Sequence, residues 1–501
     1  MPGEVIGAST WETHMNATGL LVCVLASLPL VGRRAVAAPA DQPTGPVHSV
    51  TDISHEFTFY FDGRFARNYL SARGDVDVRN WATLHKFDFR DVNLLVLPSG
   101  ASPCPYLPED VEAVRKFLQD GGGAIVLGDC TLFRKEKAYR LNVLARAFGA
   151  EFVDRPARGP LSGAGRLKDK PIKTYGGKTI RLARGAKWQV LVRDAARQVV
   201  AAHRQVGKGR LLVSSRGLVG RRPDAKDPIN AQWLQPLLRE LASGKPVDPK
   251  RRPRSQQPEN VVDRAGLKIR HSDYMQPFAE EILAVYRQCR PAMERILGVP
   301  PSEGMLASLI LLPTGGGGFS SGRAIGLGTW WGGFPERRYG MIELLGHEGT
   351  HSWVLPFPEP MWNEGIATYV GIQLGRELGY AKEADATLKN WLKSARRDDP
   401  DMKKHDLATG QDVPHAVRMG KPMWIWEQLR RERADILARY FRTKRKLADP
   451  AKLKRYTADD CVAVLSVAMG RDLFAWFRSL GIQVNRAKAQ IEAPAASSKA
   501  P

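Results

Sequence analysis

Cysteine is scarce in this sequence, and none of it is paired at a diagnostic spacing. Five cysteines are spread over 501 residues, at Cys23, Cys104, Cys130, Cys289 and Cys461, with no CxxC motif. This excludes a zinc knuckle and a thioredoxin-like redox motif. A disulfide between any two of the last four stays open.

The sequence also lacks an N-terminal apolar run long enough to span a membrane. Residues 19–31 form an apolar run of signal-peptide length, and small residues at 35–37 and 38–40 offer cleavage sites. The basic pair Arg33-Arg34 follows the run instead of preceding it, and Met15 is an alternative start. We expect residues 1–40 to be a signal peptide and the protein to be exported to the periplasm, cell surface or medium. A cytoplasmic location stays open.

Acidic residues are outnumbered, with 52 Asp and Glu against 75 Lys and Arg, which gives a net charge of +23. Such an excess favours an anionic polymer or surface as a partner. No nucleic-acid-binding motif accompanies the charge, so we expect no specific nucleic acid, and a solvated basic surface is the simpler interpretation. A hydrophobic content of 43% is typical of folded domains, and the length allows more than one.

Strands and helices alternate between residues 51 and 245. Short apolar runs at 57–61, 92–97, 124–127 and 211–215 predict strands, and helical periodicity at 108–119 and 137–148 predicts helices. Pro108 begins the first helix, and the glycines at 121–123 end it. Strands separated by helices of this length predict an α/β domain with a doubly wound, parallel sheet.

This region resembles the flavodoxin-like class I glutamine-amidotransferase fold, including its ThuA-like branch. The resemblance rests on VNLLVLPSG, VRKFLQDGGGAIVLGDC and VGKGRLLVSS. Catalytic members carry a nucleophilic cysteine in a G-x-C-x-G elbow. Here Cys130 is followed by Leu132 in place of the last glycine, and the later His203 has no His-x-Glu pair beside it. The resemblance therefore implies a non-catalytic binding or scaffold domain, with a glutaminase-type enzyme at Cys130 as the disfavoured alternative.

A proline-rich, charged segment at 246–260 predicts a linker, because it has no apolar periodicity. A second, mostly helical α+β domain is expected at 261–485. It begins with a helix at 276–297, a strand at 306–312 and a strand with glycines at 324–331. Two helices follow, at 339–354 and 361–378. Residues 486–501, rich in Ala, Lys and Ser, predict a disordered tail.

The chemistry is concentrated in His347-Glu348-Gly349-Thr350-His351 and the later Asn363-Glu364-Gly365. Residues four apart lie on one face of a helix, so His347 and His351 can present two imidazoles to one Zn²⁺ ion. Glu364 is the expected third ligand, which leaves one coordination position for water. Glu348 is the expected general base that takes the proton of this water. Glu343, one turn before His347, is a candidate acceptor for the second ring N–H of that histidine, or else an exposed salt-bridge partner.

The HExxH motif followed by Asn-Glu-Gly-x-Ala resembles the gluzincin clan of metallopeptidases. The later segments GKPMWIWEQLRR and YTADDCVAVLSVAMGRDLFAWFRSLGI are similar to the helical end of enhancin-like, mucin-targeting peptidases. The resemblance implies a zincin-like second domain with His347, His351 and Glu364 on zinc and Glu348 as base. It also implies that the strand at 324–331 is the edge strand that binds the substrate backbone.

Two positions depart from the clan. An outer-shell Asp is common four residues after the glutamate ligand, and this sequence has Thr368 there. The clan's transition-state donor, a Tyr or His, has no clear counterpart; His415 and Arg418 are the first candidates, with Tyr369 and Tyr339 after them.

The sequence thus predicts an exported zinc metallopeptidase that acts on peptide or glycoprotein substrates and carries an accessory α/β domain. The alternative is an extracellular polymer-binding protein in which the zinc site is structural or vestigial.

Overall fold

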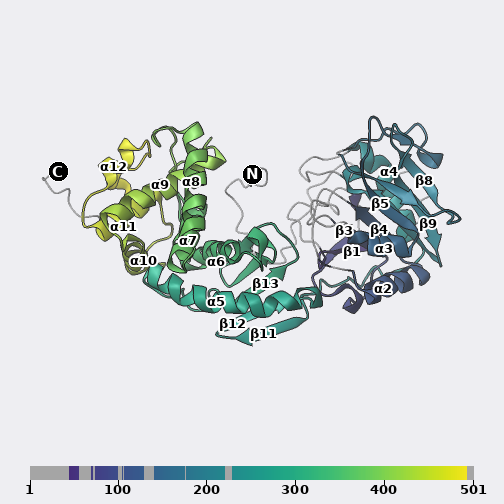
Figure 1. Ribbon diagram of the computed structural model, residues 1–501, viewed down its shortest axis with the longest axis horizontal. Coiled ribbons are helices and arrows are strands. Elements are labelled where there is room, and N and C mark those ends of the chain that lie inside the picture. The colour runs from purple at the N-terminus through teal and green to yellow at the C-terminus, as the bar shows by residue number, and fades with distance from the viewer. Residues whose placement is uncertain are drawn as a thin grey trace.

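The computed structural model describes residues 45–55, 69–70, 74–99, 104, 106–128, 140–174, 176–219 and 228–492. The predicted signal peptide, the strand at 57–61 and Cys130 lie outside these ranges. Within them, the chain forms a sheet-rich α/β region at its N-terminal side and a helical region at its C-terminal side (Figure 1). No helix of this described part is both long and apolar enough to cross a membrane.

The N-terminal region is built on a ten-stranded mixed sheet. Five strands run parallel in the order β2-β1-β3-β4-β10; these are β2 (Val76–Asn80), β1 (His48–Asp52), β3 (Leu94–Ser99), β4 (Gly123–Gly128) and β10 (Gly209–Ser215). The other strands pair antiparallel beyond β10; these are β9 (Val199–Val206), β7 (Lys178–Leu182), β5 (Ala150–Pro156), β8 (Gln189–Arg193) and β6 (Ser162–Gly163). The expectation of a wholly parallel sheet was therefore wrong for this second half.

Helices cover both faces of the parallel half. Successive strand residues point to opposite faces, so Leu95 and Leu97 of β3 pack under α2 (Pro108–Gln119) and α3 (Leu141–Ala147). Leu94 and Val96 pack under α4 (Pro228–Ala242) on the opposite face. Apolar side chains on both faces explain why these strands are unbroken apolar runs in the sequence. The antiparallel strands mix charged and apolar residues, and the sequence pattern did not reveal them.

The C-terminal region begins with a five-stranded sheet in the order β11-β12-β13-β15-β14. Its strands are β11 (Asn260–Arg264), β12 (Leu267–His271), β13 (Ser308–Leu312), β14 (Gly318–Ser320) and β15 (Ala324–Gly328). The strand predicted to bind substrate is β15, which pairs with β13 on one side and β14 on the other. Its backbone is already bonded on both sides, so the prediction that it forms the edge was wrong. The edge strand is β14, which the glycine run at 315–318 leads into.

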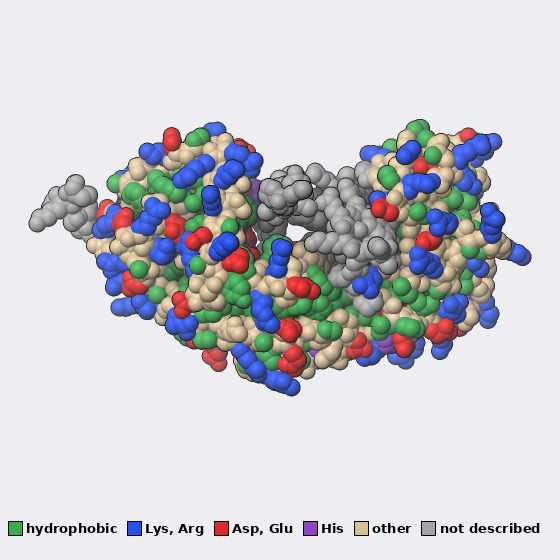
Figure 2. Space-filling model, in the orientation of Figure 1, with side chains coloured by type: hydrophobic (Ala, Val, Ile, Leu, Met, Phe, Trp, Pro, Cys, Tyr) green, Lys and Arg blue, Asp and Glu red, His purple; other side chains and the backbone are tan. Residues whose placement is uncertain are grey.

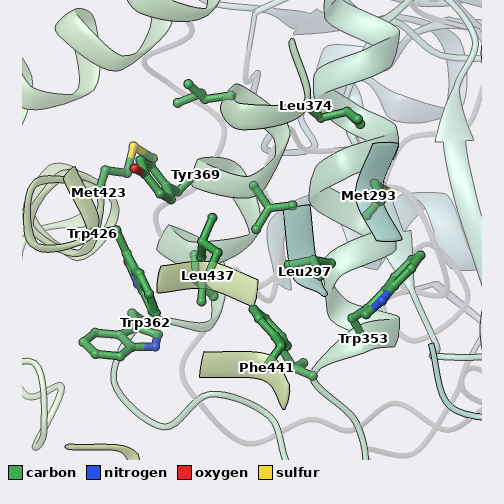
Figure 3. Close-up of a cluster of buried hydrophobic side chains, with 14 of the residues drawn as sticks. Met293, Leu297, Trp353, Trp362, Tyr369, Leu374, Met423, Trp426, Leu437 and Phe441 are labelled. Atoms are coloured by element: carbon green, nitrogen blue, oxygen red, sulfur yellow. The ribbon is translucent and has the colours of Figure 1, made fainter. Parts of the chain in front are cut away.

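Eight helices of the described chain complete this region. They are α5 (Gln276–Leu297), α6 (Arg338–Trp353), α7 (Asn363–Glu377), α8 (Ala381–Asp398), α9 (His415–Glu432), α10 (Ile436–Leu447), α11 (Ala458–Met469) and α12 (Phe474–Ser479). Figure 3 shows side chains from five of them meeting in one apolar cluster; they are Met293 and Leu297 (α5), Trp353 (α6), Tyr369 and Leu374 (α7), Met423 and Trp426 (α9), and Leu437 and Phe441 (α10), with Trp362 just before α7. This shared core holds α6 and α7 together.

Glycines let α6 and α7 approach more closely than side chains would allow. A Cβ atom on Gly346 would lie 2.6 Å from the Cα atom of Gly371, and one on Gly371 would lie 2.5 Å from the carbonyl oxygen of Glu343. Both distances are far below van der Waals contact, so the two helices can cross here only through glycine. Gly346 directly precedes His347, and the crossing therefore brings the motif on α6 close to α7.

Two predicted boundaries need correction. Residues 486–492, assigned to a disordered tail, are folded: Arg486–Lys488 form a 3-10 turn, Gln490 N donates to Asp460 Oδ1 at 2.6 Å, and Ile491 is buried. The linker at 246–260 does not run free of the first region, because Trp81 N donates to the carbonyl of Gln256 at 2.9 Å. Long-range hydrogen bonds of this kind leave no mark in local composition.

A buried polar cluster joins the two regions. His55, just after β1, stacks on Tyr106 with ring centroids 3.7 Å apart and contacts Tyr274 of the second region at 4.2 Å. Its Nδ1 atom lies 2.9 Å from Asp52 Oδ2, and its Nε2 atom lies 3.6 Å from Asp110 Oδ2. Tyr274 donates its hydroxyl to Asp110 at 2.8 Å. Two carboxylates thus enclose one imidazole at the junction between the regions.

This junction should weaken as the pH rises. Burial opposes a charge on His55, but hydrogen bonds and the negative charges of Asp110 and Asp52 outweigh it and raise the pKa to about 8. Protonation therefore favours the folded form; this contribution is complete below pH ~6.5 and is lost as the pH rises through ~8. A shift of this size corresponds to about 2 kcal/mol, so the stability advantage of the wild type over His55→Gln should shrink by that amount between pH 6 and 9 in urea unfolding. Burial lowers the pKa of His203, so replacing that residue should cause no such loss of stability with rising pH. A difference in unfolding free energy between the wild type and His55→Gln that stays constant with pH would contradict the prediction.

Candidate metal centre

One helix supplies the two histidines of the motif. His347 and His351 lie one turn apart on α6, and their Nε2 atoms are 3.3 Å from each other. Glu364 stands in the first turn of α7, with Oε2 3.3 Å from His347 Nε2 and 3.6 Å from His351 Nε2. Three ligand atoms from two helices therefore form a nearly equilateral triangle.

The size of this triangle fits a tetrahedral zinc site. Zinc binds histidine nitrogen at about 2.0–2.1 Å, which places neighbouring ligand atoms of a tetrahedron about 3.3–3.4 Å apart. The observed separations of 3.3, 3.3 and 3.6 Å fall on or close to that value. His347, Glu348 and His351 also present ligand-type atoms within 4.8 Å of one another. The residues present fit the ion that the sequence predicts.

The site is open on one side. The side chain of Glu364 is 45% exposed, whereas those of His347 and His351 are 17% and 14% exposed. Glu348 is buried, with 5% of its surface exposed. Structural zinc sites are closed by four protein ligands, and catalytic sites have three and an accessible fourth position. Three converging ligands with a solvent-facing side match the second pattern.

Each histidine has a second contact behind the triangle. Nδ1 of His347 lies 2.9 Å from Thr368 Oγ1, and Nδ1 of His351 lies 3.1 Å from the Asn363 amide. Thr368 thus takes the place of the Asp that the resemblance to the gluzincin clan implied. Of the two roles predicted for Glu343, acceptor for the second ring nitrogen of His347 was wrong, because that nitrogen contacts Thr368. Glu343 accepts a hydrogen bond from Trp331 Nε1 at 3.3 Å.

The electrostatics of the triangle favour a positive charge. Burial opposes charging of His347, but the hydrogen bond to Glu364 and the nearby carboxylates raise its pKa to about 9. Burial alone would raise the pKa of Glu364, yet its hydrogen bonds to both histidines hold that pKa well below the usual range. Burial raises the pKa of Glu348, against the opposite effect of the two histidines. A carboxylate that stays anionic beside two imidazoles could hold a cation, and one with an elevated pKa suits a proton acceptor.

The edge strand β14 passes directly over Glu348. A Cβ atom on Gly318 would lie 2.9 Å from Glu348 Oε1 and 3.0 Å from its Cγ atom, and 2.4 Å from the carbonyl oxygen of Gly326. Only glycine allows this approach. The carboxylate of Glu348 therefore lies between the two histidines and β14, the edge strand at this end of the five-stranded sheet as described.

The structure separates the four candidate transition-state donors into one that it excludes and three that it leaves open. Tyr369 was wrongly predicted as a transition-state donor, because its buried hydroxyl donates to Glu427 Oε1 at 2.9 Å in the core. Tyr339 begins α6 two turns before His347, and its ring packs 6.3 Å from that of Tyr380. His415 begins α9 with its ring 5.8 Å from Trp391, and Arg418 follows within the same turn.

His415 and Arg418 remain predictions for the donor. Their helix lies against the start of α7, since a Cβ atom on Gly365 would meet Pro422 Cβ at 2.6 Å and the carbonyl of Met419 at 3.2 Å. The second turn of α9, which follows directly after Arg418, therefore lies against the segment that carries Glu364.

Sequence reasoning overlooked three residues of the site. Thr368 was noted only as a departure, although its spacing of four from Glu364 places it on the same helix face. Asn363 adjoins Glu364 in the same motif. Gly318 ends a run of four glycines, and such a run is itself a sign of close backbone approach.

Comparison with known proteins adds little. No protein-family model and no curated protein matches the chain. Yeast LTA4 hydrolase in complex with bestatin is similar at 12% identity and a TM-score of 0.32, over 44% of this chain and 37% of that one. The mmIFT52 N-terminal domain is similar at 13% identity and a TM-score of 0.29, over 39% of this chain and 97% of that one. The cytoplasmic protein STM3548 from Salmonella typhimurium is similar at 12% identity and a TM-score of 0.29, over 39% of this chain and 99% of that one. Similarities this weak carry no argument about function.

Proposed function

We propose that this chain is a zinc-dependent peptidase of the gluzincin type, which hydrolyses peptide bonds in protein or glycoprotein substrates. One observation carries the proposal: two imidazole nitrogens and a carboxylate oxygen lie 3.3–3.6 Å apart, with the buried Glu348 beside them and solvent on one side. The sheet and helices around the site would then be a zincin-like domain.

Each residue of the proposed site would have a separate role. His347, His351 and Glu364 would hold Zn²⁺, which when bound supplies a Lewis acid and an activated water. Nδ1 of His347 lies 2.9 Å from Thr368 Oγ1, so with the proton on Nδ1 the hydroxyl would accept its N–H and Nε2 would be the ligand atom. Glu348, whose pKa is raised by burial, accepts the proton of the attacking water and passes it to the leaving amine. His415 or Arg418 would donate to the developing oxyanion.

The substrate would lie along β14. This strand has a partner only on its β15 side among the described strands, so an extended peptide can add to the sheet there by backbone hydrogen bonds. A peptide in that position would run beside β14, whose Gly318 lies against the carboxylate of Glu348.

The N-terminal region would be an accessory domain of the amidotransferase-like kind, without catalysis of its own. Lys and Arg side chains spread over both regions on the face shown in Figure 2. Together with the net charge of +23, they favour an anionic polymer or surface as the partner of an exported enzyme.

The direct test combines metal analysis with a peptide library. We expect one zinc per chain, cleavage of library peptides, and loss of cleavage after chelation that zinc restores. Zinc that is bound without cleavage above the chelated control would overturn the peptidase proposal and favour the polymer-binding alternative.

Gly318→Ala should lower turnover without removing the metal. The new methyl group would lie 2.4 Å from the carbonyl oxygen of Gly326 and 2.9 Å from Glu348 Oε1, so the strand β14 and the carboxylate must move relative to each other. A displacement of about 1 Å costs roughly 10²-fold in rate, and we expect kcat to fall by ~10–100-fold with zinc content unchanged. Gly317→Ala is the matched control, because a Cβ atom there meets nothing within 4 Å. Equal rates for the two variants would refute the proposed placement of the base.

A further inference from the structure

The connector between α6 and α7, residues 354–362, contains a buried carboxylate that the proposed chemistry does not use. Glu359 is 3% exposed and accepts hydrogen bonds from four side chains, the longest of them from Cys461 Sγ to Oε2 at 3.5 Å. Tyr440 of α10 donates to Oε2 at 2.6 Å, Trp362 donates Nε1–H to the same oxygen at 3.2 Å, and Lys444 of α10 donates to Oε1.

Lys444 also binds the connector backbone. Its ammonium group donates to the carbonyl oxygen of Phe357 at 2.7 Å and to that of Val354 at 3.2 Å. With Glu359, these contacts account for all three donors of the ammonium group. Helix α10 therefore holds the connector at its beginning, its middle and its carboxylate.

The network continues to the metal centre. The backbone N–H of Glu359 donates to Asn363 Oδ1 at 3.3 Å. The Nδ2 atom of the same Asn363 amide lies 3.1 Å from His351 Nδ1 and 3.4 Å from Glu364 Oε1. The position of Glu359 thus determines where the amide and the first turn of α7 lie relative to α6.

We propose that Glu359, held by Lys444 and Tyr440, is a positioning residue that places Asn363 and Glu364 for cation binding. This inference rests on the proposed metal centre. A buried ion pair is a poor source of stability, because desolvation offsets the attraction between the charges. Apolar packing around Trp353 and Phe441 already fills this region. Directional hydrogen bonds hold the connector in one defined position. Metal affinity depends on the positions of the ligands, so a fixed connector should strengthen binding.

Tyr440→Phe tests the proposal, with Tyr369→Phe as the matched control. Both tyrosines are buried and donate to a buried carboxylate, but the partner of Tyr369 is Glu427, outside the connector. We expect Tyr440→Phe to weaken zinc binding by ~10-fold in competition with a chelator and to alter the visible spectrum of the Co²⁺-substituted protein. Tyr369→Phe should leave both unchanged. Equal zinc affinities of the two variants would overturn the positioning role.

A second pair of variants tests the charge. Lys444→Met and Lys421→Met each remove a buried ammonium group, and Lys421 pairs with Asp399 at 3.4 Å, apart from the connector. Only Lys444→Met should lower zinc affinity beyond its effect on the unfolding midpoint. If it does not fold, the tyrosine pair decides. A wild type that binds zinc but cleaves no peptide overturns the proposed peptidase, whereas a selective loss of zinc in these variants still supports this inference.

Discussion

Glu348→Gln should abolish most peptide hydrolysis while zinc stays bound. The substitution retains the shape of the side chain but removes the proton acceptor beside His347 and His351. General-base catalysis contributes about 10²–10⁴-fold, so kcat should fall by that factor. The measurement is single-turnover cleavage of a library-derived peptide, with metal content determined on the same sample.

Glu343→Gln is the control for this experiment. Glu343 lies on the same helix one turn earlier, and its carboxylate accepts a hydrogen bond from Trp331 Nε1. Its variant should retain activity. Hydrolysis that survives in Glu348→Gln would show that another group takes the proton, and the mechanism proposed for this site would fail.

Glu364→Ala should weaken zinc binding by about two to four orders of magnitude. If three protein ligands share a binding free energy of ~10–16 kcal/mol, one of them contributes roughly 3–5 kcal/mol, and each 1.4 kcal/mol is a factor of ten. The cost to the fold should be small, because the side chain is 45% exposed. Chelator competition gives the dissociation constant, and urea unfolding of the metal-free protein gives the stability.

Glu377→Ala is the matched control on the same helix. Glu377 ends α7 in an exposed ion pair with Arg295 at 3.0 Å, far along the helix from the triangle. Its loss should change neither zinc affinity nor stability by more than a surface pair contributes, about 0–1 kcal/mol. A dissociation constant for Glu364→Ala equal to that of this control would remove Glu364 from the ligand set.

Local signals in the sequence were enough for several elements. The helices at 108–119 and 276–297 have the predicted bounds; periodicity indicated both, and Pro108 and the glycines at 121–123 delimited the first. The strands at the centre of the first sheet were visible as apolar runs, because helices cover both of their faces. The antiparallel strands were missed, since half-solvated strands in a mixed sheet carry charged residues that interrupt such runs.

The candidate site shows the same division. The spacing of His347 and His351 on one helix is a property of five consecutive residues, and it predicted the arrangement that the structure contains. Thr368 in place of Glu343, Tyr369 turned towards Glu427, and β14 as the edge strand each depend on how helices and strands pack. Packing brings together residues from distant parts of the chain, which no local pattern records.

By itself, the sequence determined which side chains can hold a cation and which carboxylate stands between the histidines, because helix geometry converts spacing into a shared face. Only the tertiary structure decided that Glu364 reaches both imidazoles and that Gly318 covers Glu348. It also decided that Glu359 ties the connector to α10. The physical reason is that α6 and α7 meet through the close approach of Gly346 and Gly371, in a core to which α5, α9 and α10 also contribute.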